Sequence, residues 1–162
     1  IATIIADAFD ADALALLAPA LVIPSLQVTQ VRVLRHFVKR RKVAWQADPD
    51  YHFHHEGDAD DDAFLGSQYW SYQYPKGIWE LERVRRQAVA CIDHLAADTL
   101  SISGGKDTTI PQEASILVTS KSKGVNKHLH IPEAGHLMPY DKNMAAQNEA
   151  MAAVVAWMEG ER

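Results

Sequence analysis

The stretch TLSISGGKDTTIP, residues 99–111, decides the fold of this chain. Its first five residues predict a short β-strand, which ends at a pair of glycines. Thr109 and Gln112 have the spacing of a helix capping box, with Pro111 in the first turn, and predict that a helix follows. A strand, a glycine turn and a helix in this order are typical of an α/β sheet whose helices connect parallel strands.

The segments on either side continue this alternation. Residues 13–18 form an unbroken apolar run that Pro19 closes, which suits a strand covered on both faces. Residues 128–131 predict a third strand, and Asp141 or Asn143 caps a final helix. The apolar stripe that we expect this helix to bury consists of Met144, Met151, Val154, Val155 and Met158. The pattern predicts half of an α/β sheet that carries a long insertion after its first strand.

The insertion differs in composition from the segments around it. Residues 51–62 are rich in His and Asp and predict an exposed loop, and aromatic residues are concentrated in residues 67–79, which contain Tyr69, Trp70, Tyr72, Tyr74 and Trp79. Because aromatic side chains commonly line ligand pockets, we predict substrate contacts at Trp70, Tyr74 and Trp79. Packing within the insertion explains the same aromatic residues equally well.

A carboxylate and an imidazole each follow a predicted strand. Asp107 lies in the glycine turn within residues 99–111, and His136 ends the turn EAGH, residues 133–136, just after another strand. In a hydrolase with a nucleophilic hydroxyl, a carboxylate orients an imidazole, and the imidazole takes the hydroxyl proton. The pattern therefore predicts Asp107 as the acid and His136 as the base. Each also has an ordinary interpretation, as a turn aspartate that caps the next helix and as a loop histidine bonded to backbone.

The nucleophile of such a site is missing from the sequence. The Gly-x-Ser-x-Gly turn, which presents a nucleophilic serine, does not occur in the 162 residues. Ser103 is the nearest substitute, since it stands at a strand end before two glycines. It lies only four residues before Asp107, however, so the usual arrangement of the three groups would have to be rebuilt. We do not assign Ser103 as the nucleophile.

Together these features resemble the C-terminal part of an α/β-hydrolase, closest to the small carboxylesterase and monoacylglycerol lipase group. The resemblance rests on four segments, in the order expected of the family. They are similar to the strand after the nucleophile helix, the return of the lid, the acid loop and the histidine loop. These are residues 13–20 (ALALLAPA), 74–81 (YPKGIWEL), 103–111 (SGGKDTTIP) and 134–136 (AGH).

The resemblance implies a partial α/β-hydrolase fold, with C-terminal parallel strands and flanking helices in residues 1–24 and 93–162 and a lid insertion in residues 25–92. It also implies a carboxylic-ester hydrolase of the esterase or monoacylglycerol lipase type, with Asp107 as the triad acid and His136 as the general base. The serine and the oxyanion-hole amides of the family would precede this chain. We therefore expect an upstream segment that carries the nucleophile, a small-molecule ester as substrate, and no cofactor.

Two other functions stay open. The chain can be a non-catalytic module for binding or assembly, because an exposed strand edge at residues 13–18 invites pairing with another chain, including a second copy in a homodimer. It can also be a related hydrolase, of the dehalogenase type, in which the same acid and histidine serve an upstream Asp instead of Ser. The residues that precede Ile1 would distinguish these possibilities.

The composition argues against several other classes of protein. The net charge of -5 and the pI near 5.9 argue against nucleic acid as a partner. Cys91, the single cysteine, cannot form an internal disulfide, which fits a cytoplasmic location. No apolar stretch reaches the ~18 residues that cross a bilayer. The histidines and aspartates of residues 51–62 lack the spacing of a metal motif, so we predict no metal site.

Overall fold

The computed structural model of the chain describes residues 1–22, 25–42 and 72–161. The chain divides into two compact units, which we describe separately. The first consists of Ile1–Val22 and Val84–Arg162, and the second of Ile23–Arg83. Helix α4, Pro75–Cys91, crosses the boundary between them.

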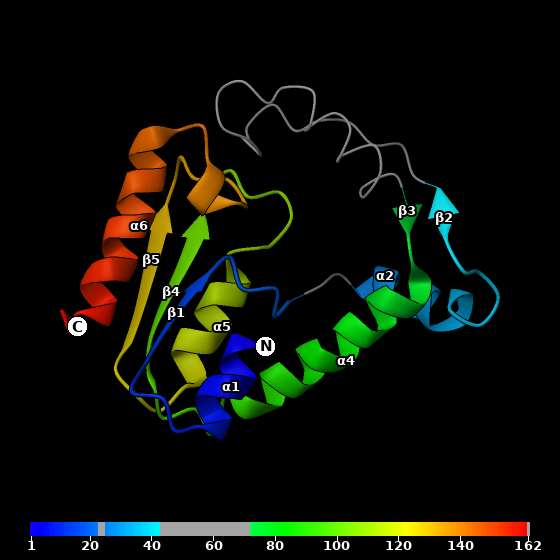
Figure 1. The fold of residues 1–162 in the computed structure, drawn as a ribbon, viewed down its shortest axis with the longest axis horizontal. Helices are drawn as coiled ribbons and strands as arrows, with labels where there is room; N and C mark the ends of the chain where they lie inside the picture. Colours follow the sequence, from blue (N-terminus) through cyan, green and yellow to red (C-terminus); the bar gives the residue numbers. More distant parts are fainter. Residues whose placement is uncertain (23–24, 43–71, 162) are drawn as a thin grey trace. The chain divides into compact units, whose positions relative to one another are not determined.

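A parallel three-stranded sheet forms the centre of the first unit (Figure 1). Its strands are β1 (Ala13–Leu17), β4 (Asp98–Gly104) and β5 (Asn126–Ile131), in the spatial order β1-β4-β5. The central strand β4 is buried along nearly its whole length, as the apolar and small residues of its sequence predict. Because all three strands run in the same direction, the loops that follow β4 and β5 emerge at the same edge of the sheet.

Helices cover both faces of this sheet (Figure 1). Helix α6 (Met144–Met158) packs on one face, and α1 (Ala2–Ala8) and α5 (Glu113–Lys121) pack on the other. Each face has its own apolar core. The core under α6 contains Leu100, Ile102, Ile131, Met138, Ala146, Ala150 and Trp157. The opposite core contains Ala6, Leu14, Leu16, Ala88, Ile92, Leu95, Ala114 and Val118.

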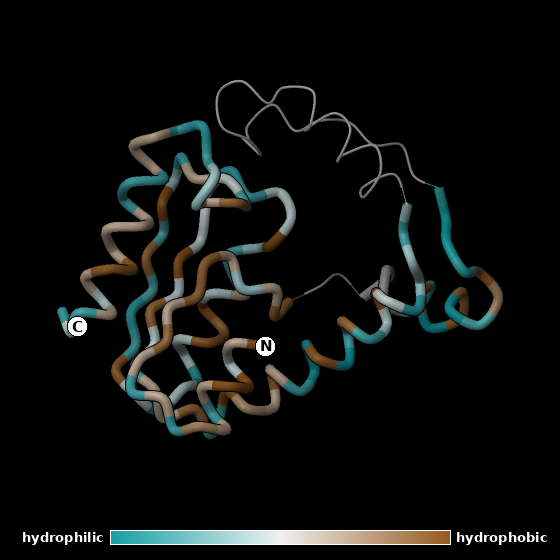
Figure 2. The backbone as a smooth tube through the Cα atoms, viewed as in Figure 1, coloured by the Kyte–Doolittle hydropathy of each residue, from teal (hydrophilic) through white to brown (hydrophobic). Residues whose placement is uncertain are grey.

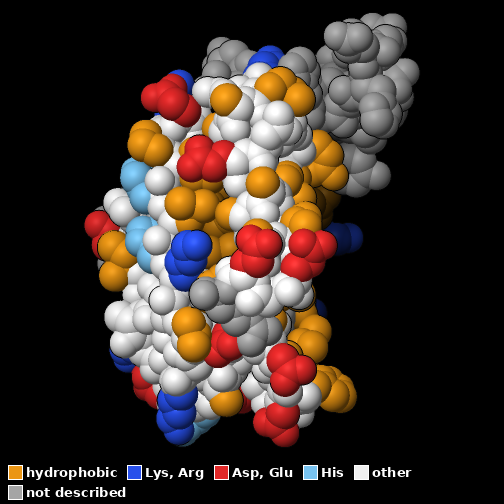
Figure 3. Space-filling view, turned by 90° about the vertical axis from the view of Figure 1, so that its left-hand side faces the viewer, with side chains coloured by type: hydrophobic (Ala, Val, Ile, Leu, Met, Phe, Trp, Pro, Cys, Tyr) orange, Lys and Arg blue, Asp and Glu red, His pale blue; other side chains and the backbone are white. Residues whose placement is uncertain are grey.

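The prediction for α6 was right about the helix, but of the five residues predicted to be buried only Val154 packs against the core, and it is partly buried. The helix buries Ala146, Ala150 and Trp157, whereas Met144 and Met158 are more than half exposed. Small alanines let a helix approach the sheet closely, and the single Trp157 fills the remaining space, so the larger methionines point outward. The exposed apolar side chains are visible on this face of the molecule (Figure 3). Asn143 caps the helix, its side chain accepting a hydrogen bond from the Ala146 N–H at 3.2 Å.

The second unit combines short elements with the beginning of α4. Helix α2 (Ser25–Leu34) precedes a two-stranded antiparallel ribbon of β2 (Arg41–Lys42) and β3 (Tyr72–Gln73). The hydrophilic colour of β2 in Figure 2 reflects its two basic residues. No helix in the described parts of either unit is long and apolar enough to cross a membrane.

Candidate active site

The carboxylate of Asp107 and the imidazole of His136 meet at the edge of the sheet where β4 and β5 end. The Oδ2 atom of Asp107 lies 3.0 Å from the Nδ1 atom of His136. Its Oδ1 atom accepts hydrogen bonds from the backbone N–H groups of Thr109 and Ile110, both at 2.8 Å. The Asp107 side chain is 1% exposed and the His136 side chain is 28% exposed. The acid is thus fixed by three hydrogen bonds, while the imidazole can be reached from solvent.

The same hydrogen bonds explain why one sequence prediction fails. Helix α5 begins at Glu113, and Gln112 at its N-cap makes no capping hydrogen bond through its side chain within the described residues. The predicted capping box of Thr109 and Gln112 is therefore wrong. The backbone N–H group of Thr109 instead donates to Asp107. Asp107 orders the turn before the helix and contacts His136 at the same time, so its two interpretations do not exclude each other.

Two glycines allow the acid loop and the histidine loop to touch through their backbones. A Cβ atom on Gly104 would lie 2.3 Å from the carbonyl oxygen of Ala134, and one on Gly105 would lie 2.3 Å from that of Pro132. The Lys106 N–H group donates to the Ala134 carbonyl at 3.0 Å. Any side chain at either glycine would push the loops apart, because the obstructing atoms belong to rigid backbone. This close approach brings together two residues that are 29 positions apart in the sequence.

A second carboxylate, that of Asp141, holds the histidine loop from the other side. It is buried, and its Oδ2 atom accepts a hydrogen bond from the Gly135 N–H at 2.6 Å. Its Oδ1 atom accepts from the Asn143 N–H at 2.9 Å. Asp141 therefore ties the residue before His136 to the start of α6. The sequence indicated Asp141 only as an alternative cap of the last helix. Its position five residues after His136 was the one feature that could have indicated a contact with the histidine loop.

This arrangement can move a proton at the imidazole. If Nδ1 carries a hydrogen and donates it to Asp107, then Nε2 is the ring nitrogen with a lone pair. That atom can accept a proton from a hydroxyl and later return it, while the nearby carboxylate stabilises the positive charge on the ring. The geometry provides two of the three groups of a nucleophilic hydrolase site.

Ser103, which the sequence suggested as the nearest substitute for a nucleophile, forms hydrogen bonds away from Asp107 and His136. Its hydroxyl lies within the strand β4, is buried, and forms hydrogen bonds with His128 and His130 of β5. Its burial and these contacts argue against Ser103 as the nucleophile.

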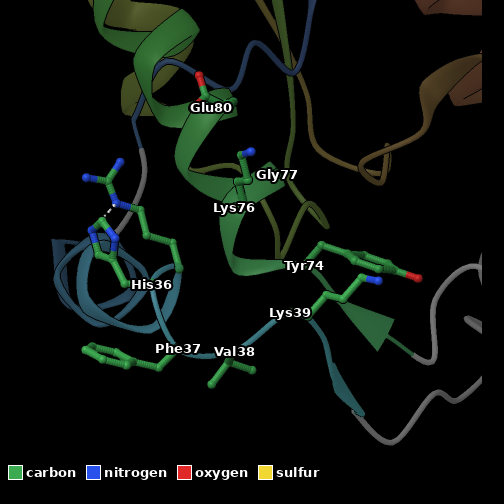
Figure 4. Close-up of a pocket in the computed structure, with 9 residues that line it drawn as sticks. His36, Phe37, Val38, Lys39, Tyr74, Lys76, Gly77 and Glu80 are labelled. Atoms are coloured by element: carbon green, nitrogen blue, oxygen red, sulfur yellow. Dashed lines mark hydrogen bonds between the residues drawn. The ribbon is translucent and has the colours of Figure 1, made fainter.

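The predicted aromatic contacts belong to the second unit. Tyr74 is half exposed and lines a cavity of about 680 Å³ between the segment after α2 and the beginning of α4 (Figure 4). Arg35, Lys39 and Lys76 also line this cavity, so its wall combines aromatic and cationic groups. Trp79 lies beneath the guanidinium of Arg35, with 4.1 Å between the Arg35 Cζ atom and the ring centre. Trp70 lies outside the described residues.

Within the described residues, no three or more His, Cys, Asp and Glu side chains form a cluster suited to a metal ion. The loop at residues 51–62, which we considered for this role, lies outside them.

Comparisons with known proteins bear on the fold. The sequence matches no family model and no curated protein. Among solved structures, the chain is similar to a monoacylglycerol lipase from Paleococcus ferrophilus, with 18% identity and a TM-score of 0.64 over 94% of this chain and 61% of that one. A structure from work on the metagenome-derived lipolytic enzymes LipS and LipT has 12% identity and a TM-score of 0.69, over 94% of this chain and 59% of that one.

A third similar structure is a soluble variant of monoglyceride lipase from Saccharomyces cerevisiae in complex with a substrate analogue. It has 16% identity and a TM-score of 0.64, over 90% of this chain and 52% of that one. The predicted partial α/β-hydrolase fold is confirmed. The chain spans between 52% and 61% of the length of these three structures, so it corresponds to only part of the fold.

Proposed function

We propose that this chain is the C-terminal part of a carboxylic-ester hydrolase whose nucleophilic serine lies in residues that precede Ile1. One observation carries the proposal: the His136 Nδ1 atom lies 3.0 Å from a buried carboxylate oxygen of Asp107, at the strand ends of an α/β-hydrolase fold. Ligands of open α/β sheets bind at this edge, outside the carboxyl ends of the strands. An Asp–His pair in the interior of a strand would not indicate a ligand site in this way.

In the proposed reaction, His136 acts as the general base and Asp107 as its orienting acid. The Nε2 atom of His136 takes the proton of the serine hydroxyl while the serine oxygen attacks the ester carbonyl. The tetrahedral intermediate expels the alcohol, which receives that proton from His136, and an acyl-enzyme remains. Water, activated by the same imidazole, then releases the carboxylic acid. Backbone N–H groups of the preceding residues would stabilise the oxyanion.

The proposed substrates are short- or medium-chain acyl esters or monoacylglycerols. The second unit supplies the proposed contacts, through Tyr74, Trp79 and Trp70. Tyr74 lines a cavity large enough for a small molecule, which supports this assignment. An aromatic ring can bind an acyl chain or an aryl group through apolar contact area, and this contact needs no ion pair.

A fluorophosphonate probe, which reacts with activated serines, tests the proposal. We expect it to label a protein that contains this chain together with its preceding residues, and not to label the 162-residue chain alone. Asp107→Asn and His136→Ala should each slow labelling and ester hydrolysis by roughly 10³–10⁴-fold, because the serine then lacks an oriented base. The preceding sequence should contain Gly-x-Ser-x-Gly within about ten positions of Ile1, since the nucleophile begins the helix that ends in α1.

Asp93→Asn and His94→Ala are matched controls, because both residues are exposed and lie in a turn after α4. These two variants should keep the full labelling rate. Labelling of the chain by itself would show that the nucleophile is inside it. An upstream Asp in the elbow would instead identify a dehalogenase-type hydrolase with the same acid and base.

A further inference from the structure

A second histidine cluster lies in the first unit, within the strands rather than beyond them. The Oγ atom of Ser103 lies 2.8 Å from the Nε2 atom of His128 and 3.0 Å from the Nδ1 atom of His130. Ser103 pairs with His130 across β4 and β5, and His128 precedes His130 by two residues. Residues two apart on a strand share a face of the sheet, so both imidazoles stand on the same face as the hydroxyl.

The two imidazoles direct one nitrogen each toward the same oxygen atom. A serine hydroxyl has a single hydrogen, so it can donate to only one of the two nitrogens, and at least one ring must donate to it. Hydrogen bonding alone thus requires at least one of the two facing nitrogens to be protonated. A metal ion needs no such hydrogen, because it accepts the lone pairs of both nitrogens at once.

We propose that His128 and His130 chelate a late first-row divalent ion, Cu²⁺, Ni²⁺ or Zn²⁺, with the Ser103 hydroxyl oxygen as a third donor. Imidazole nitrogen is a preferred ligand of all three ions. The ligating atoms are His128 Nε2 and His130 Nδ1, which lie 2.8 Å and 3.0 Å from the Ser103 oxygen. This site is independent of the proposed ester hydrolysis, since it uses neither Asp107 nor His136.

The surroundings of the pair favour a bound cation that approaches from the solvent. His130 is exposed, and β5 is an outer strand of the sheet, so an ion can enter from that side.

One buried polar atom beside the pair supports the same conclusion. Ser101 pairs with His128 across the strands and is fully buried, and its hydroxyl has no hydrogen-bond partner among the described residues. Buried hydroxyls are rarely left without a partner. An ion held by His128 brings coordinated water into this polar strip, and such water can accept the Ser101 hydrogen.

Paramagnetic line broadening by Cu²⁺ in the ¹⁵N-labelled full chain tests the site. We expect one equivalent of Cu²⁺ to broaden the amide signals of residues 128–130 and of Ser103 first. His128→Asn and His130→Asn should each weaken binding by roughly 10-fold or more, since even partners outside the ligand set change metal affinity by 10–100-fold. Ser103→Ala, which keeps both imidazoles, should have a smaller effect in the same direction.

His94→Asn is the matched control, because this histidine is exposed and lies outside the cluster. It should leave the broadening and the affinity unchanged. Broadening that begins at residues 52–55, which contain three other histidines, would overturn the proposal, as would equal affinity in the His130→Asn variant. The wild-type broadening pattern decides the matter even where a variant fails to fold.

Discussion

Two histidine clusters share β4 and β5, and they differ in how the chain brings their members together. The Asp107–His136 pair stands on loops after the strands, and a backbone contact between these loops holds it in place. The cluster of Ser103, His128 and His130 lies within the strands, where ladder pairing alone fixes it. The first pairs an imidazole with a carboxylate, and the second pairs two imidazoles with a neutral hydroxyl.

The comparison shows that strand pairing and loop contact set different chemistry. A histidine beside a buried carboxylate has a partner that stabilises its positive charge, so it is suited to proton transfer. Within the described residues, the two histidines around one hydroxyl have no carboxylate partner, and burial together with the neighbouring His130 lowers the pKa of His128. Their facing nitrogens can donate lone pairs. Changes that affect one cluster and spare the other therefore test whether the two are separate.

The largest effect on stability is expected from Gly104→Ala. The new Cβ atom would lie 2.3 Å from the Ala134 carbonyl oxygen, so the acid and histidine loops must separate. We expect the free energy of unfolding to fall by about 3 kcal/mol, the upper part of the range for an overpacked site. The Asp107–His136 hydrogen bond should be lost as well. Urea unfolding and the ring-proton signal of His136 measure the two effects.

Gly77→Ala is the matched glycine control. A Cβ atom there would meet only the Tyr74 Cβ atom at 3.7 Å, an ordinary contact within α4. This variant should gain about 0.5–1 kcal/mol, because alanine favours a helix over glycine. If Gly104→Ala were as stable as wild type, the loops would not touch in solution as they do here.

The sequence predicted the loop cluster better than the strand cluster, for a physical reason. Asp107 and His136 each follow a glycine turn at a strand end, and parallel strands place such turns at one edge, so the pairing follows from topology. The contact of Ser103 with His128 and His130 depends on the register of β4 against β5, which a single sequence does not reveal. Without that register, two histidines on a strand carry no information about their partner.

Two other predictions failed because several groups compete for the same hydrogen bond or the same buried position. The sequence pattern does not show which group wins. The spacing of Thr109 and Gln112 predicts a capping box, but the Thr109 N–H group is already bonded to Asp107. Helix α6 contains large methionines and small alanines, and the fit to the sheet selected the alanines and Trp157 for burial. Hydrophobicity alone favours the methionines. Packing geometry, which needs the facing surface, decides otherwise.

A middle-sized effect is expected from Asp141→Ala. The substitution leaves the backbone N–H groups of Gly135 and Asn143 without their acceptor, at a site where Asp141 is buried. The free energy of unfolding should fall by about 2 kcal/mol, within the range for unsatisfied buried donors. Because Gly135 precedes His136, the ring signals of His136 should shift while those of His128 and His130 stay in place.

Asp141→Asn refines this test. An amide side chain has one acceptor oxygen, so it can keep one of the two hydrogen bonds and should lose less stability than alanine. Equal stability of wild type, Asn and Ala variants would contradict the anchoring role. A shift of all three histidine signals would show that the two clusters are coupled through the sheet.

The smallest and most specific effect concerns the ring hydrogens of the strand cluster in metal-free buffer. If the Ser103 hydroxyl donates to His128 Nε2, then His128 carries its hydrogen on Nδ1, and His130 must donate from Nδ1. If the hydroxyl donates to His130 Nδ1, both rings carry their hydrogens on Nε2. Whenever the hydroxyl donates to one ring and accepts from the other, the two neutral imidazoles therefore share one tautomer, which ¹⁵N ring chemical shifts reveal.

Ser103→Ala removes the atom that couples the two rings. The free energy of unfolding should fall by about 1 kcal/mol, the typical net value of the hydrogen bonding lost. Each ring should then adopt its tautomer independently, whereas the His136 signals should not change, since that ring contacts Asp107 and lies outside the Ser103 cluster. A hydrogen on Nδ1 of His128 together with one on Nε2 of His130 would leave both facing nitrogens as acceptors, so Ser103 could bond to only one imidazole. The convergence of both nitrogens on its oxygen would then be absent in solution.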